Sequence, residues 1–278
     1  MQIRPRKISY GVAIAQEVLG EGVPVPFQCG LREGMEKAAA MGFDCVEIHI
    51  RSPLDFDPTA LLRASQETGV RIAAIGTGLE YGRNGLSLTA EDPSVRAKAV
   101  ERMREHIDLA ANFGAVVFLG LIRGKCGCKA RLPEYLDRLA QSLVPLARHA
   151  GESGVPTGLE PVAYYFSDLL NTTNETLTFL ERPGLESIGL LLDTHHIFLE
   201  DRSMEDSFRS CAGRITHVHI SDSNRRYPGA GNVDFALAAR TLADIGYAGA
   251  VSLEILPAPS GEEAARKGIA WMREAFGR

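Results

Sequence analysis

The chain has 278 residues, of which 45% are hydrophobic and 23% are charged, and its formal net charge is −5. This composition is typical of a folded globular protein and excludes a largely disordered chain. The negative net charge and the lack of a basic stripe argue against a nucleic-acid-binding protein, and no run of apolar residues is long enough to predict a membrane span.

Short apolar runs alternate with amphipathic segments along the chain. The runs predicted to form buried strands are 8–14, 45–50, 71–77, 115–121, 157–162, 188–193, 215–221 and 250–255. The segments with helical periodicity are 34–42, 94–114, 131–154, 172–181, 235–246 and 262–276. Thr172 and Glu175 have the spacing of a capping box, which predicts a helix start at this point.

The alternation of strands and helices predicts a parallel sheet. Eight units of roughly 33 residues fill the chain, close to the ~250 residues typical of a (β/α)8 barrel. The alternative is an open doubly wound sheet, which should have a glycine-rich phosphate turn after its first strand. Residues 11–22 form no such turn. We therefore predict an α/β protein with one TIM-barrel domain over residues 1–278.

The cysteines predict no zinc site and no disulfide framework. Five are present, Cys29, Cys45, Cys126, Cys128 and Cys211. The pair in "KCGC" has no second pair to complete a zinc site, so all five are expected to be reduced thiols of a cytoplasmic protein. The apolar run near the N-terminus is too short and interrupted to predict a signal peptide.

Acids and imidazoles occupy the ends of four consecutive predicted strands. The chemistry of a TIM barrel gathers at the C-terminal ends of its strands. There the fifth strand has Glu160, the sixth has Asp193, the seventh has His217 and His219, and the eighth has Glu254. Three carboxylates buried together without a cation would repel one another strongly. Carboxylates with one imidazole suit Mn²⁺ or Mg²⁺ and also admit Co²⁺ or Zn²⁺.

Each of these residues also has a simpler interpretation. A single acid at a strand end is more often a helix cap, and a single buried histidine is more often a core residue. Their recurrence on four strands in series favours the metal site. His217 and His219 lie on the same face of their strand, and the position nearer the tip favours His219 as the ligand. His49 is interpreted as a pocket or a structural residue, and His106 and His149 are expected at the surface.

Four stretches carry a resemblance to a known family, namely 75–89, 113–124, 191–201 and 219–235. Through them the chain resembles the xylose-isomerase-like TIM-barrel superfamily over roughly residues 7–275. More narrowly it is similar to the ketose 3-epimerases that act on D-tagatose and D-psicose, and most of all to the 5-keto-L-gluconate epimerase branch.

The resemblance implies roles for six residues. A glutamate, an aspartate, a histidine and a second glutamate hold one metal in the family, and these correspond here to Glu160, Asp193, His219 and Glu254. A histidine and an arginine that hold substrate oxygens correspond to His196 and Arg225. One departure is that the family usually has Asn, Arg and Glu where this chain has Ala163, Tyr164 and Phe166, which implies a more apolar pocket wall.

These residues imply an isomerase, a divalent-metal-dependent sugar epimerase or isomerase. It would transfer a proton next to the carbonyl of a keto-sugar or keto-aldonate through an enediolate, with Glu160 and Glu254 as the catalytic pair. The alternatives are a metal-dependent dehydratase of a keto-sugar or keto-inositol and a sugar-binding relative with altered catalysis. An endonuclease IV-like DNA-repair enzyme is less favoured, because it would need more zinc ligands and a basic groove.

The expected partner is a small-molecule sugar, with neither nucleic acid nor membrane. The resemblance implies a homo-oligomer, a dimer or tetramer, and a cytoplasmic location is expected. The loops 76–85 and 122–128 are predicted to line the mouth of the barrel. Their basic residues, Arg83, Arg123 and Lys125, would meet an anionic group of the substrate or remain solvated surface charges.

Overall fold

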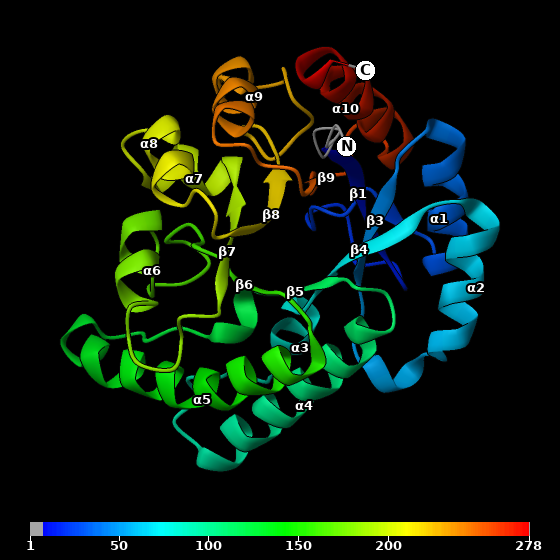
Figure 1. Ribbon diagram of the computed structural model, residues 1–278. Helices are drawn as coiled ribbons and strands as arrows, with labels where there is room; N and C mark the ends of the chain where they lie inside the picture. The colour runs from blue at the N-terminus through cyan, green and yellow to red at the C-terminus, as the bar shows by residue number, and fades with distance from the viewer. Residues whose placement is uncertain (1–7, 278) are drawn as a thin grey trace, which may run out of the picture.

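Parallel strands form a closed ring in the computed structural model, which describes residues 8–277 (Figure 1). Each strand pairs with the next, and β1 pairs with β9 to close the ring. The barrel strands are β1 (Ser9–Ala15), β3 (Cys45–His49), β4 (Arg71–Gly76), β5 (Val116–Leu119), β6 (Thr157–Leu159), β7 (Gly189–Asp193), β8 (Ile215–Ile220) and β9 (Ala250–Leu253). The predicted (β/α)8 barrel is confirmed.

Helices surround the barrel and cover the outer faces of its strands (Figure 1). The longer ones are α1 (Leu31–Met41), α2 (Pro58–Thr68), α4 (Pro93–Ala111), α5 (Leu132–Ser153), α9 (Phe235–Asp244) and α10 (Gly261–Phe276). The shorter ones are α3 (Gly78–Gly82), α6 (Thr173–Phe179), α7 (Thr194–Glu200) and α8 (Met204–Ser210). Short 3₁₀ turns occupy Pro53–Asp55, Leu121–Arg123 and Lys129–Arg131.

The strands are buried on both faces, by side chains inside the barrel and by the helices outside it. Every residue of β7 is buried, as is every residue of β3. This double burial explains why the strand sequences are apolar throughout instead of alternating. It also means that a charged side chain on these strands points into the barrel interior or lies at its mouth.

The elements that the sequence did not predict are short or polar. The strand β2 (Phe27–Gln28) has two residues and adds to the edge of β1. The helix α2 buries only Leu61 and Ala64. Asp57 caps it by accepting a hydrogen bond from the backbone N–H of Thr59. By contrast, the capping box of Thr172 and Glu175 at α6 is confirmed.

Two further expectations have clear outcomes. The prediction that His106 lies at the surface is wrong, because its side chain is fully buried and its Nε2 donates to Oε1 of Glu80 at 2.9 Å. The five cysteines all lie within residues 8–277, and none of them forms a disulfide there, as predicted.

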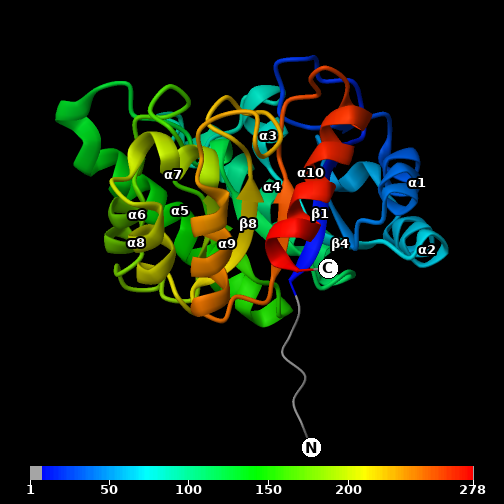
Figure 2. The same cartoon turned by 90° about the horizontal axis from the view of Figure 1, so that it is seen from above.

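The loops that follow the strands gather at one end of the barrel. The view in Figure 2 runs across the barrel, with α3 at the end toward which β8 points. Within residues 8–277, no helix has the length and apolarity that a membrane crossing requires.

Candidate active site

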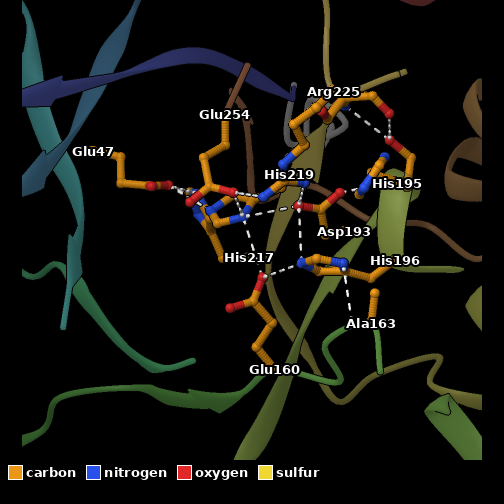
Figure 3. Close-up of polar contacts among 12 residues, drawn as sticks. Glu47, Glu160, Ala163, Asp193, His195, His196, His217, His219, Arg225 and Glu254 are labelled. Carbon is orange, nitrogen blue, oxygen red and sulfur yellow. Dashed lines mark hydrogen bonds and ion pairs between the residues drawn. The ribbon is translucent and has the colours of Figure 1, made fainter. Parts of the chain in front are cut away.

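Four side chains from consecutive strands meet at the C-terminal end of the barrel. Glu160 directly follows β6, Asp193 ends β7, His219 lies in β8 and Glu254 directly follows β9. One donor atom from each lies within 4.8 Å of the others, and all four residues are buried. Figure 3 shows the three carboxylates pointing toward the His219 ring. The structure therefore brings together the four residues that the sequence proposed as a cluster.

The geometry of this cluster fits a divalent cation. The His219 Nδ1 lies 3.4 Å from Oε2 of Glu254, and 3.6 Å from both Oε1 of Glu160 and Oδ2 of Asp193. This nitrogen is buried and has no hydrogen-bond partner. Three carboxylate oxygens around one unpaired imidazole nitrogen form the donor set that Mn²⁺ or Mg²⁺ accepts in proteins.

The pKa values of two acids in the cluster move in opposite directions. Burial, together with the charges of Glu254 and Asp193, raises the pKa of Glu160. Burial also disfavours the charged form of Asp193, but the Arg225 guanidinium beside it holds the pKa of Asp193 well below its usual range. The Arg225 guanidinium contacts the carboxylates of both Asp193 and Glu254. Glu160 therefore binds a proton more strongly than an ordinary glutamate, and Asp193 binds one more weakly than an ordinary aspartate.

A folded loop after β8 places Arg225 over the cluster. Its centre is the buried carboxylate of Asp222, which accepts four backbone N–H bonds at 2.7–3.1 Å from Ser223, Gly229, Gly231 and Val233. Arg225 adopts a left-handed backbone with φ of 62°, and its N–H donates to the Asp222 carbonyl oxygen at 2.8 Å. Asp222 was not predicted from the sequence, because an acid in a glycine-rich loop carries no periodic signal.

His196 points into the same end of the barrel. The backbone N–H of Ala163 donates to its Nδ1 at 3.2 Å, so the ring proton lies on Nε2. This Nε2 is 3.9 Å from Oε1 of Glu160 and 4.0 Å from Oδ2 of Asp193. Burial lowers the pKa of His196 well below its usual value, so the ring is neutral and offers one N–H at the site.

His195 turns away from the cluster. Its Nδ1–H donates to the carbonyl oxygen of Asp222 at 3.0 Å. Its Nε2 accepts from the hydroxyl of Tyr165 at 2.7 Å. His195 therefore ties the loop after β6 to the loop after β8 at the edge of the site.

A cavity of about 420 Å³ opens above the cluster. Glu160, Glu254, His196 and Arg225 all line it, together with Phe166. The rest of the lining is mainly apolar, and its members from the loops after β1, β4, β5 and β6 include Leu19, Val23, Leu79, Leu121 and Val162.

The replaced residues of the β6 loop lie at different depths. Phe166 lines the cavity and meets the His196 ring edge-to-face, with centroids 5.7 Å apart. Ala163 is buried, and Tyr164 is 72% exposed outside the cavity lining. The expected apolar wall is therefore formed mainly by Phe166.

The three basic loop residues have different surroundings. Arg83 lines the cavity, as predicted for the mouth. Lys125 is exposed outside the cavity lining. Arg123 is fully buried and its Nη1 donates to the carbonyl oxygen of Leu170 at 3.0 Å, so neither interpretation given for it holds. Its burial lowers the pKa of Arg123 to about 10.

The comparison with known families agrees with this architecture. A family model described as "Xylose isomerase-like TIM barrel" matches residues 35–275. The chain belongs to this family.

Curated members of the xylose isomerase-like family that match the chain include sugar epimerases. An L-ribulose 3-epimerase from Mesorhizobium japonicum is 32% identical over 82% of this chain and 76% of its own length. A ketose 3-epimerase from Arthrobacter globiformis is also 32% identical, over 81% of this chain and 77% of its own. A crystal structure of D-allulose 3-epimerase from Methylomonas sp. with D-allulose superposes with a TM-score of 0.81 at 25% identity, covering 98% of both chains.

One buried residue of this xylose isomerase-like barrel was not predicted from the sequence. It is Glu47 of β3. In the structure its carboxylate accepts hydrogen bonds from His49, His217 and His219. The signal was present as an acid in a strand buried on both faces, but the partners on β8 are distant in sequence.

Proposed function

We propose that this protein is a divalent-metal-dependent sugar epimerase, an isomerase. It would invert the configuration of a carbon next to the carbonyl of a keto-sugar or keto-aldonate by proton transfer. The observation that carries the proposal is the buried cluster of Glu160, Asp193, His219 and Glu254 at the base of a cavity of about 420 Å³. The 3-epimerase names of the relatives support the same reaction class.

Epimerisation removes a proton from one face of a carbon and returns a proton to the other face. Two carboxylates are suited to this, because one can take the proton while the other gives one. Glu160 and Glu254 both line the cavity and are carried by β6 and β9, which are not neighbours in the sheet.

The proposed ligands are Glu160, Asp193, His219 and Glu254, and Mn²⁺ or Mg²⁺ are the ions that best suit them. A bound divalent cation would stabilise the negative charge that develops on the substrate oxygens when the proton leaves. The unpaired Nδ1 of His219 and the three converging carboxylates support this assignment.

His196 and Arg225 are proposed to hold the substrate oxygens. The neutral His196 ring presents one N–H beside Glu160, and both residues line the cavity. Arg225 offers a guanidinium whose Nε is buried without a hydrogen-bond partner. Phe166 and the apolar lining would contact the carbon skeleton, and Arg83 at the mouth would accommodate the carboxylate of a keto-aldonate.

The deciding experiment is a screen of keto-sugars and keto-aldonates in deuterated water with added Mn²⁺ or Mg²⁺. We expect deuterium at a single carbon next to the carbonyl, an epimeric product, and loss of activity when EDTA removes the ion. Loss of water from the substrate would indicate a dehydratase instead. Binding of a ketose without any exchange would indicate a sugar-binding relative.

The two carboxylates are tested separately. Glu160→Gln and Glu254→Gln should keep the fold, because glutamine has nearly the same shape, and should lower kcat by several orders of magnitude. Circular dichroism controls for folding. Near-normal turnover in either variant would rule out the two-carboxylate scheme.

We further propose that the protein forms a dimer or tetramer and acts in the cytoplasm as a single-domain enzyme. Analytical ultracentrifugation of the purified protein measures the oligomeric state. A monomer at micromolar concentration would contradict the proposed dimer or tetramer.

A further inference from the structure

Glu47 is a fully buried carboxylate in the middle of the barrel. Its Oε1 accepts a hydrogen bond from Nε2 of His49 at 2.7 Å. Its Oε2 accepts from Nε2 of His217 at 2.9 Å and from Nε2 of His219 at 2.8 Å. In Figure 3, Glu47 approaches the imidazoles from the side opposite Asp193. One acid on β3 therefore orders three rings.

The two ring nitrogens of His219 face different partners. The Nε2–H is directed at Glu47, while Nδ1 faces the carboxylates of Glu254, Glu160 and Asp193 at 3.4–3.6 Å. A neutral imidazole with its proton on one nitrogen presents a lone pair on the other. A carboxylate on the outer nitrogen of a metal-binding histidine fixes both the tautomer and the ring orientation.

We propose that Glu47 is a positioning residue for the metal site: it holds the His219 ring so that the Nδ1 lone pair points at the cation. The inference rests on the proposed function in that it requires the cluster to bind an ion. Glu47 lies outside the cavity lining and outside the four-residue cluster, so it would act through His219.

Phe118 of β5 completes this arrangement. Its ring meets the His219 ring edge-to-face, with centroids 5.1 Å apart, and stacks parallel to His217 at 6.5 Å. The aromatic contact limits rotation of the His219 ring, and the hydrogen bond from Nε2 to Glu47 selects between its two flipped orientations. A flip by 180° would exchange Nδ1 with Cδ2 and Nε2 with Cε1, and packing alone cannot distinguish these groups, because they have nearly the same size.

The same contacts argue against Glu47 as a ligand of a second ion. Donor atoms of Glu47, His49 and Glu254 lie within 4.8 Å of one another. The Glu47 carboxylate already accepts hydrogen bonds from three imidazole N–H groups, so only about one of its four lone-pair sites remains for an ion. We therefore expect one divalent ion per chain.

The test compares Mn²⁺ binding by the wild-type protein and by Glu47→Leu and Glu47→Gln, titrated by electron paramagnetic resonance. Loss of a carboxylate behind a metal-binding histidine typically weakens metal affinity about 10–100-fold. We expect the leucine variant near the upper end, because His219 loses its acceptor. We expect Mn²⁺ affinity to fall about tenfold in Glu47→Gln. The glutamine amide oxygen can still accept hydrogen bonds from His217 and His219, but it carries no charge.

The matched control is Glu80→Leu. Glu80 is also fully buried and also accepts a hydrogen bond from a buried imidazole, that of His106 at 2.9 Å, but it has no contact with the cluster. The control should lose stability, measured by urea unfolding in EDTA, and keep the wild-type Mn²⁺ affinity. A general effect of losing a buried acid would weaken Mn²⁺ binding in both proteins.

The outcomes separate the inference from the proposed function. Wild-type protein that takes up no Mn²⁺ would overturn both. If the wild-type protein binds one ion and Glu47→Leu binds it with the same affinity, the inference alone is overturned. Binding of two ions per chain would also overturn the inference alone. If the leucine variant does not fold, Glu47→Gln decides, and wild-type affinity in that variant would refute the positioning role.

Discussion

Asp193 has two separate tasks, one for each of its oxygens. Oδ1 accepts from the backbone N–H of His195 at 2.8 Å and caps α7. Oδ2 faces the cluster, 3.6 Å from Nδ1 of His219, and contacts Arg225. For an acid at a strand end, helix cap and metal ligand were competing interpretations of the sequence. The structure places Asp193 where both tasks are compatible.

Two substitutions of Asp193 should separate these tasks. Asn can still cap the helix and Ala cannot, so without metal Asp193→Ala should be about 0.5–2 kcal/mol less stable than Asp193→Asn. Both should lose most of their Mn²⁺ affinity, because neither supplies an anionic oxygen. Urea unfolding in EDTA and Mn²⁺ titration measure the two effects. Equal unfolding midpoints would show that the cap contributes nothing.

At the scale of elements, the short helix α3 is attached to α4 by buried polar groups. The Glu80 carboxylate accepts from His106 at 2.9 Å, from Asn84 at 2.7 Å and from Arg102 at 3.3 Å. Three residues of α3, Gly78, Leu79 and Gly82, line the cavity. The Glu80 cluster therefore holds α3 against α4, at a wall of the cavity that carries none of the four proposed metal ligands.

The Glu80 cluster predicts a specific pH dependence of stability. Burial acts to raise the pKa of Glu80, but the hydrogen bonds from His106 and Asn84 outweigh it and bring the pKa below its ordinary 4.5. The contribution of the charged form is therefore present above pH 4.5 and is lost as the pH falls through the lower folded pKa.

Glu80→Gln should then be less stable than the wild type at pH 7, with a difference that shrinks toward pH 3. Urea unfolding at a series of pH values measures it. A difference that stays constant over this range would show that the charge of Glu80 adds nothing to stability.

At the scale of the whole molecule, the candidate ligands span the second half of the barrel. They come from β6, β7, β8 and β9, and β9 also pairs with β1 at the closure of the ring. A bound ion would therefore connect the C-terminal ends of four strands. Metal binding should stabilise the entire fold instead of one loop.

This predicts a rise in Tm on addition of Mn²⁺. A ligand that binds only the folded state adds about 2.7 kcal/mol when its concentration is 100 times Kd. For a chain of this size that free energy corresponds to roughly 5 °C. Differential scanning calorimetry with a series of Mn²⁺ concentrations measures the shift. Asp193→Ala serves as the control, and an equal shift in this variant would place the ion elsewhere.

The sequence by itself determined the barrel and the residues at its mouth. Strand periodicity is a local property, and burial on both faces leaves continuous apolar runs such as that of β7, so an acid at the end of such a run is conspicuous. The helix α2 was missed because a helix on the outside of a barrel needs only a narrow apolar stripe, here Leu61 and Ala64.

Only the tertiary structure decided which atoms of the site face one another. Glu47 is 172 residues from His219, and no local pattern connects them. No local pattern connects the backbone N–H of Ala163 with His196, whose tautomer it fixes. None connects Glu80 with the buried His106, whose N–H it accepts. Hydrogen-bond partners depend on which strands and loops become neighbours when the ring closes. Periodicity records whether a side chain is buried, but not which side chain lies opposite it.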